Sequence, residues 1–138
     1  MPRLSLFALF LAAVAATPVR ADTHETQLQN LARFQKYAGA PVESFAMWEL
    51  YQWQGLGPEH VAVWAAVNKV YLLKLSQPCA HLEYANTIRV TSQMQHKVTR
   101  GFDYVDFDAQ HCQIIEIRPI DYRALRHENR EPAPAATS

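Results

Sequence analysis

The sequence has few of the residues and motifs by which common enzyme classes are recognised. It holds four glycines in 138 residues, and none lies in a Gly-x-Ser-x-Gly, P-loop or dinucleotide-binding pattern. Ser-x-x-Lys is absent as well. His24-Glu25 begins like the His-Glu-x-x-His of zinc proteases, but Leu28 replaces the second histidine. These absences argue against motif-defined hydrolases and nucleotide-binding enzymes, so the catalytic residues are unknown and no cofactor is expected. An enzyme whose residues meet only in the folded chain remains open.

An excess of charge of one sign is also lacking, because thirteen Lys and Arg balance thirteen Asp and Glu. A nucleic-acid-binding protein normally carries a basic excess, so no nucleic-acid partner is expected. Hydrophobic residues make up 49% of the chain and charged residues 19%, which is typical of a globular protein. The length suits one domain.

A single long apolar run, residues 4–16, follows Arg3 near the start of the chain. Val19-Arg20-Ala21 then fits the small-x-Ala rule, so residues 1–21 are predicted to be a secretory signal peptide. Ala13-Val14-Ala15 offers a second cleavage site. The run is shorter than the ~20 residues of a membrane-spanning helix, which argues against an uncleaved anchor. No later segment is long and apolar enough to span a membrane, so no span is expected after cleavage. Cleavage leaves 117 residues (138 − 21) with eleven bases and thirteen acids. The product is predicted to be periplasmic or secreted.

The two cysteines, Cys79 and Cys112, are expected to pair, because exported proteins meet an oxidising environment. With only two cysteines the connectivity is fixed. The chain has no Cys-x-x-Cys, which gives thioredoxin-like chemistry no support.

The mature chain is predicted to form one mainly β domain, residues 22–130, with its core at 44–121. Apolar spacing predicts a helix over 26–38 that ends at Gly39 and Pro41. Asp121 is expected to cap a short helix through Arg126. Residues 131–138 are rich in Pro and Ala and are expected to be disordered. The expected strands cover residues 45–53, 61–65, 70–75, 87–91, 103–107 and 112–118, with a short edge strand at 97–100. The strands at 61–65 and 70–75 are expected to form a hairpin around 67–69, and Pro119 is expected to end the last strand. About six such strands without intervening helices predict a small antiparallel sandwich or barrel.

Aromatic residues suggest a binding surface, since exposed aromatics stack on sugars or anchor protein partners. Trp48, Tyr51 and Trp53 are the candidates, with Trp53 expected to be the most exposed. The alternative is that most of these three, together with Trp64 and Tyr71, lie in the core, as aromatic residues on adjacent strands usually do.

Two further hypotheses stay open. The first is a hydrolase of envelope polymers, because paired carboxylates can divide acid and base roles. Its candidate residues, with His111 beside them, are Asp103, Asp106, Asp108 and Glu116. The second is a metal site at His81, His111 and Asp108, where the disulfide would draw the two histidines together.

Residues 37–121 contain the stretches LYQWQGLGPEH, VYLLKLSQPC and CQIIEIRPID. The chain here resembles a family of small exported proteobacterial proteins of unknown function (domain-of-unknown-function family 6491). The resemblance implies an envelope protein with a paired cysteine and implies no activity. Many such chains resemble lipoproteins, but this one lacks a lipid-accepting cysteine. The matching positions are Gly39, Trp48, Trp53, Leu56, Trp64, Tyr71, Leu72, Leu73, Leu75, Cys79, 88–92, Cys112, Ile117, Arg118, Pro119 and Asp121. The sequence thus favours a non-enzymatic module that binds an envelope protein or a ligand.

Overall fold

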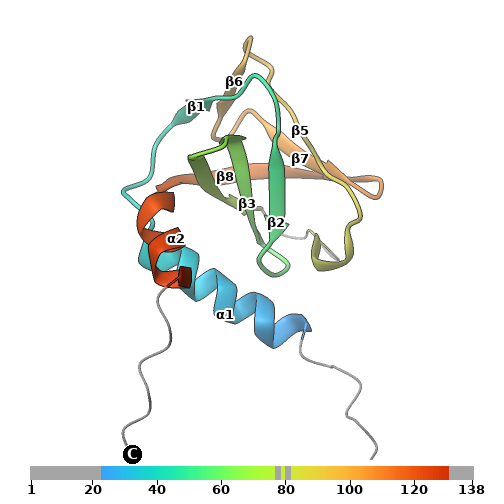
Figure 1. Ribbon diagram of the computed structural model, residues 1–138. Coiled ribbons are helices and arrows are strands. Elements are labelled where there is room, and N and C mark those ends of the chain that lie inside the picture. The colour runs from blue at the N-terminus through green and yellow to red at the C-terminus, as the bar shows by residue number, and fades with distance from the viewer. Residues whose placement is uncertain (1–22, 77–78, 80–81, 131–138) are drawn as a thin grey trace, which may run out of the picture.

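The computed structural model describes residues 23–76, 79 and 82–130. The predicted signal peptide (1–21), the predicted tail (131–138) and His81 lie outside these ranges. In Figure 1 the strands form the upper body, and the two α-helices lie together below them. The elements are α1 (Thr23–Lys36), β1 (Ser44–Ala46), β2 (Gln52–Gly55), β3 (His60–Ala66), β4 (Lys69–Leu75), η1 (Leu82–Tyr84), β5 (Arg89–Val90), β6 (Lys97–Thr99), β7 (Tyr104–Phe107), β8 (Gln110–Ile120) and α2 (Tyr122–Arg130).

The described strands form two antiparallel sheets, one of six strands in the order β2-β3-β4-β8-β7-β5 and one that pairs β1 with β6. The eleven-residue β8 curls the larger sheet, because residues 110–113 pair with β7 and residues 114–120 pair with β4. A register shift opposite Lys74 and Leu75 marks the bend, as β-bulges usually do. The result is a curled half-barrel, which confirms the mainly β antiparallel fold with eight strands in place of about six.

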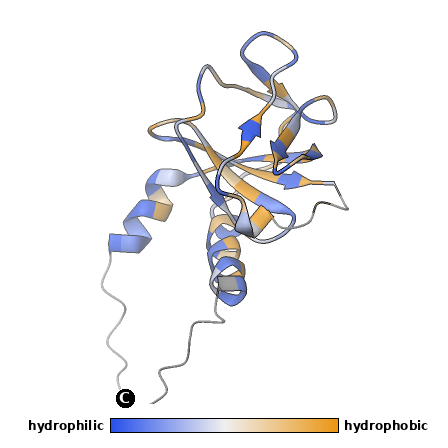
Figure 2. Cartoon of the chain, turned by 90° about the vertical axis from the view of Figure 1, so that its right-hand side faces the viewer, coloured by the Kyte–Doolittle hydropathy of each residue, from blue (hydrophilic) through white to orange (hydrophobic). Residues whose placement is uncertain are grey.

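Alternation along β3, β4 and β8 gives this sheet two apolar faces. The inner face packs against β1, β6, β7 and η1 through residues such as Val63, Leu73 and Ile117, all fully buried. The outer face is covered by Phe34 of α1 and Leu125 of α2. Figure 2 shows the strands rich in hydrophobic residues and α2 largely hydrophilic. Each helix therefore packs one apolar stripe against the outer face of the sheet.

Trp64 lies where both helices meet the outer face. Its ring makes edge contacts with Phe34 at 6.1 Å and with Tyr122 at 5.6 Å between centroids. The expected burial of Trp64 is confirmed, since 4% of it is exposed. In α2, Asp121 Oδ1 accepts a hydrogen bond from the Ala124 N–H at 3.1 Å, so the predicted cap is present.

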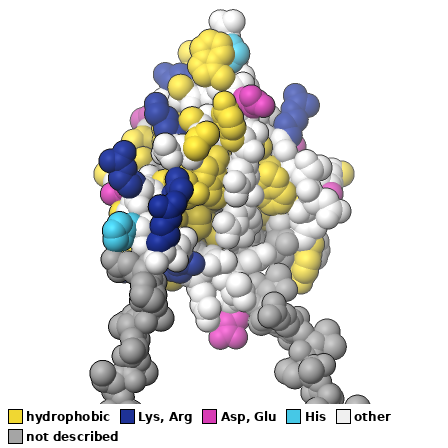
Figure 3. All heavy atoms as spheres, viewed as in Figure 1, with side chains coloured by type: hydrophobic (Ala, Val, Ile, Leu, Met, Phe, Trp, Pro, Cys, Tyr) yellow, Lys and Arg dark blue, Asp and Glu magenta, His cyan; other side chains and the backbone are white. Residues whose placement is uncertain are grey.

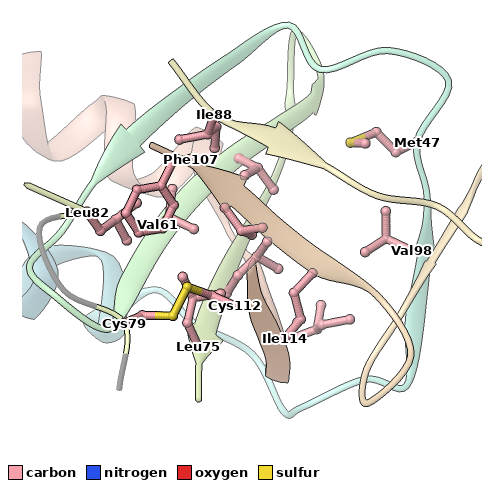
Figure 4. Close-up of a cluster of buried hydrophobic side chains, with 14 of the residues drawn as sticks. Met47, Val61, Leu75, Cys79, Leu82, Ile88, Val98, Phe107, Cys112 and Ile114 are labelled. Atoms are coloured by element: carbon pink, nitrogen blue, oxygen red, sulfur yellow. A yellow bond between two sulfur atoms is a disulfide. The ribbon is translucent and has the colours of Figure 1, made fainter. Parts of the chain in front are cut away.

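The predicted Cys79–Cys112 disulfide is confirmed, with 6.1 Å between the Cα atoms. Figure 4 shows it inside the buried cluster, near Leu75 and Leu82. It ties the segment that follows β4 to the start of β8, next to the β7–β8 hairpin. The bond therefore joins two parts of the half-barrel wall that are 33 residues apart in sequence.

Several local predictions were wrong. Helix α1 begins at Thr23 and ends at Lys36, short of the predicted end at 38, because Ala38 forms a β-bridge with Ile120. Residues 47–51 lie outside any strand, so the expected strand 45–53 is divided into β1 and β2. The expected stop at Pro119 also fails, because β8 continues to Ile120. Pro119 lies opposite Tyr71 of β4. Its carbonyl oxygen points away from β4 and accepts a hydrogen bond from the Gly39 N–H at 2.7 Å. The missing proline N–H lies on that outer side, where no ladder partner needs it.

Candidate functional site

The three aromatic residues predicted to form one binding surface lie in different surroundings. Trp48 is 78% exposed and Tyr51 is 59% exposed. Trp53, expected to be the most exposed, is half-buried against the inner core cluster. Tyr51 lies apart from Trp48, beside Tyr122 and Arg126 of α2, where it lines a small cavity. Of the three predicted residues, Trp48 is therefore the exposed one that lies next to β1.

Trp48 is held by a partner that the sequence did not suggest. Its ring stacks on His96 at 3.7 Å between centroids, with an angle of 20° between the planes. The Met47 N–H donates to the His96 carbonyl at 2.9 Å, so the two residues are positioned by adjacent segments that leave β1 and enter β6. His96 has φ +55°, a left-handed conformation that non-glycine residues seldom adopt. An exposed indole thus packs against an imidazole that the backbone of the neighbouring segment positions.

A hollow of about 640 Å³ lies next to this stack. Its lining residues are Ser44, Phe45, Ala46, Trp48, Gln95, His96 and Lys97. Figure 3 shows hydrophobic side chains beside a histidine at the top of the molecule, the end at which Figure 1 labels β1 and β6. We call these seven residues the Trp48 surface.

The Trp48 surface includes an edge of β1 that pairs with no other strand in the described part of the chain. The Glu43 carbonyl accepts from the Arg100 N–H, and the Met47 N–H donates to the His96 carbonyl, just beyond the two ends of β6. Phe45 pairs with Val98 between them. Since bonding alternates along an antiparallel ladder, the N–H and C=O groups of Ser44 and Ala46 point away from β6. An exposed edge of this kind can pair with an extended segment of another chain.

The carboxylates predicted as a catalytic set are not gathered in one cavity. Asp103 is completely buried. Its Oδ1 accepts from Thr91 Oγ1 at 2.9 Å and from the Gln93 N–H at 2.8 Å, and its Oδ2 accepts from the Thr99 N–H at 2.7 Å. Both oxygens are therefore occupied in bracing residues 91–99, the segment that carries His96.

The other members of that set have separate partners. Asp106 Oδ1 lies 2.5 Å from His111 Nδ1, and the His111 ring stacks on Tyr104 at 3.7 Å. Glu116 Oε1 accepts from Arg118 Nε at 2.7 Å. Asp108 is exposed in the β7–β8 turn with φ +45°. His111 and Asp106 form a histidine–carboxylate pair of the kind found in active sites. Because 60% of the His111 side chain is exposed, this pair lies on the open surface and not in a cavity that excludes water.

The residues whose pKa values are shifted lie outside both the Trp48 surface and the predicted carboxylate set. Burial, and then the ammonium of Lys74 on the neighbouring strand, lower the pKa of His60, while Glu59 and Glu116 oppose this shift. The Tyr37 hydroxyl, aided by the Lys36 ammonium, lowers the pKa of Glu128 in α2. The second shift reflects the contact of α1 with α2, where Lys36 Nζ lies 3.6 Å from Glu128 Oε1.

The metal hypothesis depends on His81, which lies outside the described residues. Among the residues that are described, no group of three or more His, Cys, Asp or Glu could hold a metal ion. Nor is either helix, within the described ranges, long and apolar enough to cross a membrane.

Fold and surface together define a small mainly β domain closed by one disulfide, with an aromatic surface at one end. The chain belongs to a family of unknown function (DUF6491), whose model matches residues 2–136. This match confirms the family number that the sequence suggested. No curated protein and no solved structure matches the chain.

Proposed function

We propose that this protein is an exported, non-enzymatic module that binds a partner protein through the Trp48 surface. The observation that carries the proposal is the 78% exposure of an indole that stacks on His96. Tryptophan is among the residues that dominate binding energy at protein interfaces. A side chain that is already packed before binding loses less entropy on association.

The partner we propose is an extended segment of another envelope protein. Its backbone would pair with the outward N–H and C=O groups of Ser44 and Ala46, while its side chains contact Trp48 and enter the adjoining hollow. Backbone pairing supplies affinity in this mode, and side-chain pockets supply specificity. The disulfide supports export, since such bonds persist mainly in oxidising compartments. We place the protein in the periplasm or outside the cell.

Two substitutions test this proposal without touching the core. Trp48→Ala removes the indole, and Ala46→Pro removes an N–H that points away from β6. We expect each to weaken partner binding by roughly 10- to 30-fold, since truncating a central interface residue costs about 2 kcal/mol. Immobilised wild-type protein should retain an envelope protein that both variants release.

Tyr51→Ala is the matched control, because Tyr51 is an exposed aromatic residue outside the Trp48 surface. It should retain the same partner with wild-type affinity. If Tyr51→Ala releases the partner as readily as Trp48→Ala, or if Trp48→Ala retains it fully, the proposed surface is wrong.

A further inference from the structure

A second surface, at the opposite end of the molecule, is strongly basic. In α2, Arg123, Arg126 and Arg130 follow one another at intervals of three and four residues, so they share one face of the helix. Figure 3 shows Lys and Arg side chains gathered on the left, over α2. These arginines line a cavity of about 500 Å³ together with Asn68, Ile120, Asp121, Tyr122 and His127.

Among the described residues, no carboxylate forms an ion pair with these guanidinium groups. Glu128 of the same helix is engaged by Lys36 and Tyr37. Asp121 lines the cavity, but its Oδ1 accepts the capping hydrogen bond from Ala124. The cavity thus carries three full positive charges against one negative charge.

Helix stability does not explain this arrangement. The helix dipole favours a cation near the last turn, which accounts for Arg130. Arg123 lies in the first turn, where the dipole disfavours a cation. Like charges four residues apart, such as Arg126 and Arg130, destabilise a helix as well. A cluster that opposes the stability of its own helix is typical of a binding site.

The neighbouring cavity adds a further unpartnered donor. A smaller cavity of about 260 Å³ also has Tyr122 and Arg126 in its lining, with Tyr51 and Trp64. The indole Nε1 of Trp64 is buried and has no hydrogen-bond partner among the described residues. Arg126, whose guanidinium lies 5.7 Å from the Tyr122 ring centre, is common to both cavities.

We propose that this basic surface binds an anion that carries two or more phosphate groups. Guanidinium groups match phosphate with two parallel hydrogen bonds. Arg123 and Arg130 are seven residues apart, which is about 10 Å along a helix. Cations spread over that length of helix suit a chain of phosphates or a diphosphorylated headgroup better than a single phosphate. The site is distinct from the Trp48 surface and does not depend on its proposed function.

The test measures binding of tripolyphosphate and orthophosphate to the purified, processed protein by calorimetry at low salt. A second arm measures co-sedimentation with phosphatidylcholine vesicles that contain or lack cardiolipin, a lipid with two phosphates. We expect tripolyphosphate, cardiolipin vesicles or both to bind. If tripolyphosphate binds, its affinity should be at least tenfold higher than that of orthophosphate. Binding of tripolyphosphate alone identifies a free ligand, and binding of vesicles alone identifies a headgroup.

Arg126→Gln should weaken the binding that is observed by about tenfold or more. Arg89→Gln, on the exposed strand β5, should change it by less than twofold. Both substitutions replace partly or fully exposed side chains, so thermal unfolding should be unchanged. Failure of both probes to bind would overturn the proposal. Equal losses in Arg126→Gln and Arg89→Gln would also overturn it, because they would show attraction by overall charge alone.

Discussion

Reduction of the Cys79–Cys112 disulfide should lower the free energy of unfolding by about 4 kcal/mol, because the open chain regains the entropy that the closed loop denies to the unfolded state. Domains of this size have a total stability of only ~5–15 kcal/mol. The melting temperature should therefore fall by roughly 15–20 °C. Urea unfolding of the oxidised and reduced protein measures the difference directly.

The double variant Cys79→Ala, Cys112→Ala is the control. It should be as unstable as the reduced protein or more so, since both cysteines also pack in the buried cluster. A reducing agent should not change its stability further. Equal stability of the oxidised and reduced wild type would contradict the expected role of the bond.

Asp103→Ala should destabilise the fold by about 3–5 kcal/mol. The substitution leaves the Gln93 N–H, the Thr99 N–H and the Thr91 hydroxyl without their acceptor. A buried donor that loses its partner costs about 1–3 kcal/mol. These three hydrogen bonds are partly buried, so each is expected to contribute near the lower end of that range. Because Asp103 braces the segment that carries His96, partner binding at the Trp48 surface should weaken with it. Denaturant unfolding gives the first effect and the capture experiment gives the second.

Glu43→Gln is a fitting comparison, because Glu43 is an exposed carboxylate that pairs with Arg100 at 2.9 Å. Exposed pairs contribute about 0–1 kcal/mol, so this variant should unfold almost as the wild type does. If Asp103→Ala were equally mild, the buried carboxylate would not be the brace that its hydrogen bonds indicate.

Local patterns predicted those elements whose residues interact with near neighbours in the chain. The β3–β4 hairpin follows from two apolar runs around a short turn, and the α2 cap follows from Asp121 before the helix. The disulfide followed from cysteine count and export. The prediction that β8 ends at Pro119 was wrong because the effect of a proline depends on which side of the strand its nitrogen faces. Here that side faces Gly39, a neighbour that is distant in sequence.

The candidate surfaces were harder to predict, since they join segments that are distant in sequence. Trp48 and His96 are 48 positions apart, and they meet because β1 pairs with β6. The regular spacing of Arg123, Arg126 and Arg130 is visible in the sequence, but the cavity beside them depends on Asn68 from the β3–β4 turn. The exposure of a side chain also depends on packing between distant segments. For this reason the sequence predicted Trp53, and not Trp48, to be the most exposed of the three aromatic residues.

The most direct measurement of binding at the Trp48 surface is site-specific photo-cross-linking in intact cells. A photo-reactive side chain placed at Trp48 should form a covalent adduct with one partner protein, because this position is exposed beside the edge of β1 that faces away from β6. The same side chain at Tyr51 should form none with that partner. An adduct from Tyr51 and none from Trp48 would contradict the proposed binding surface.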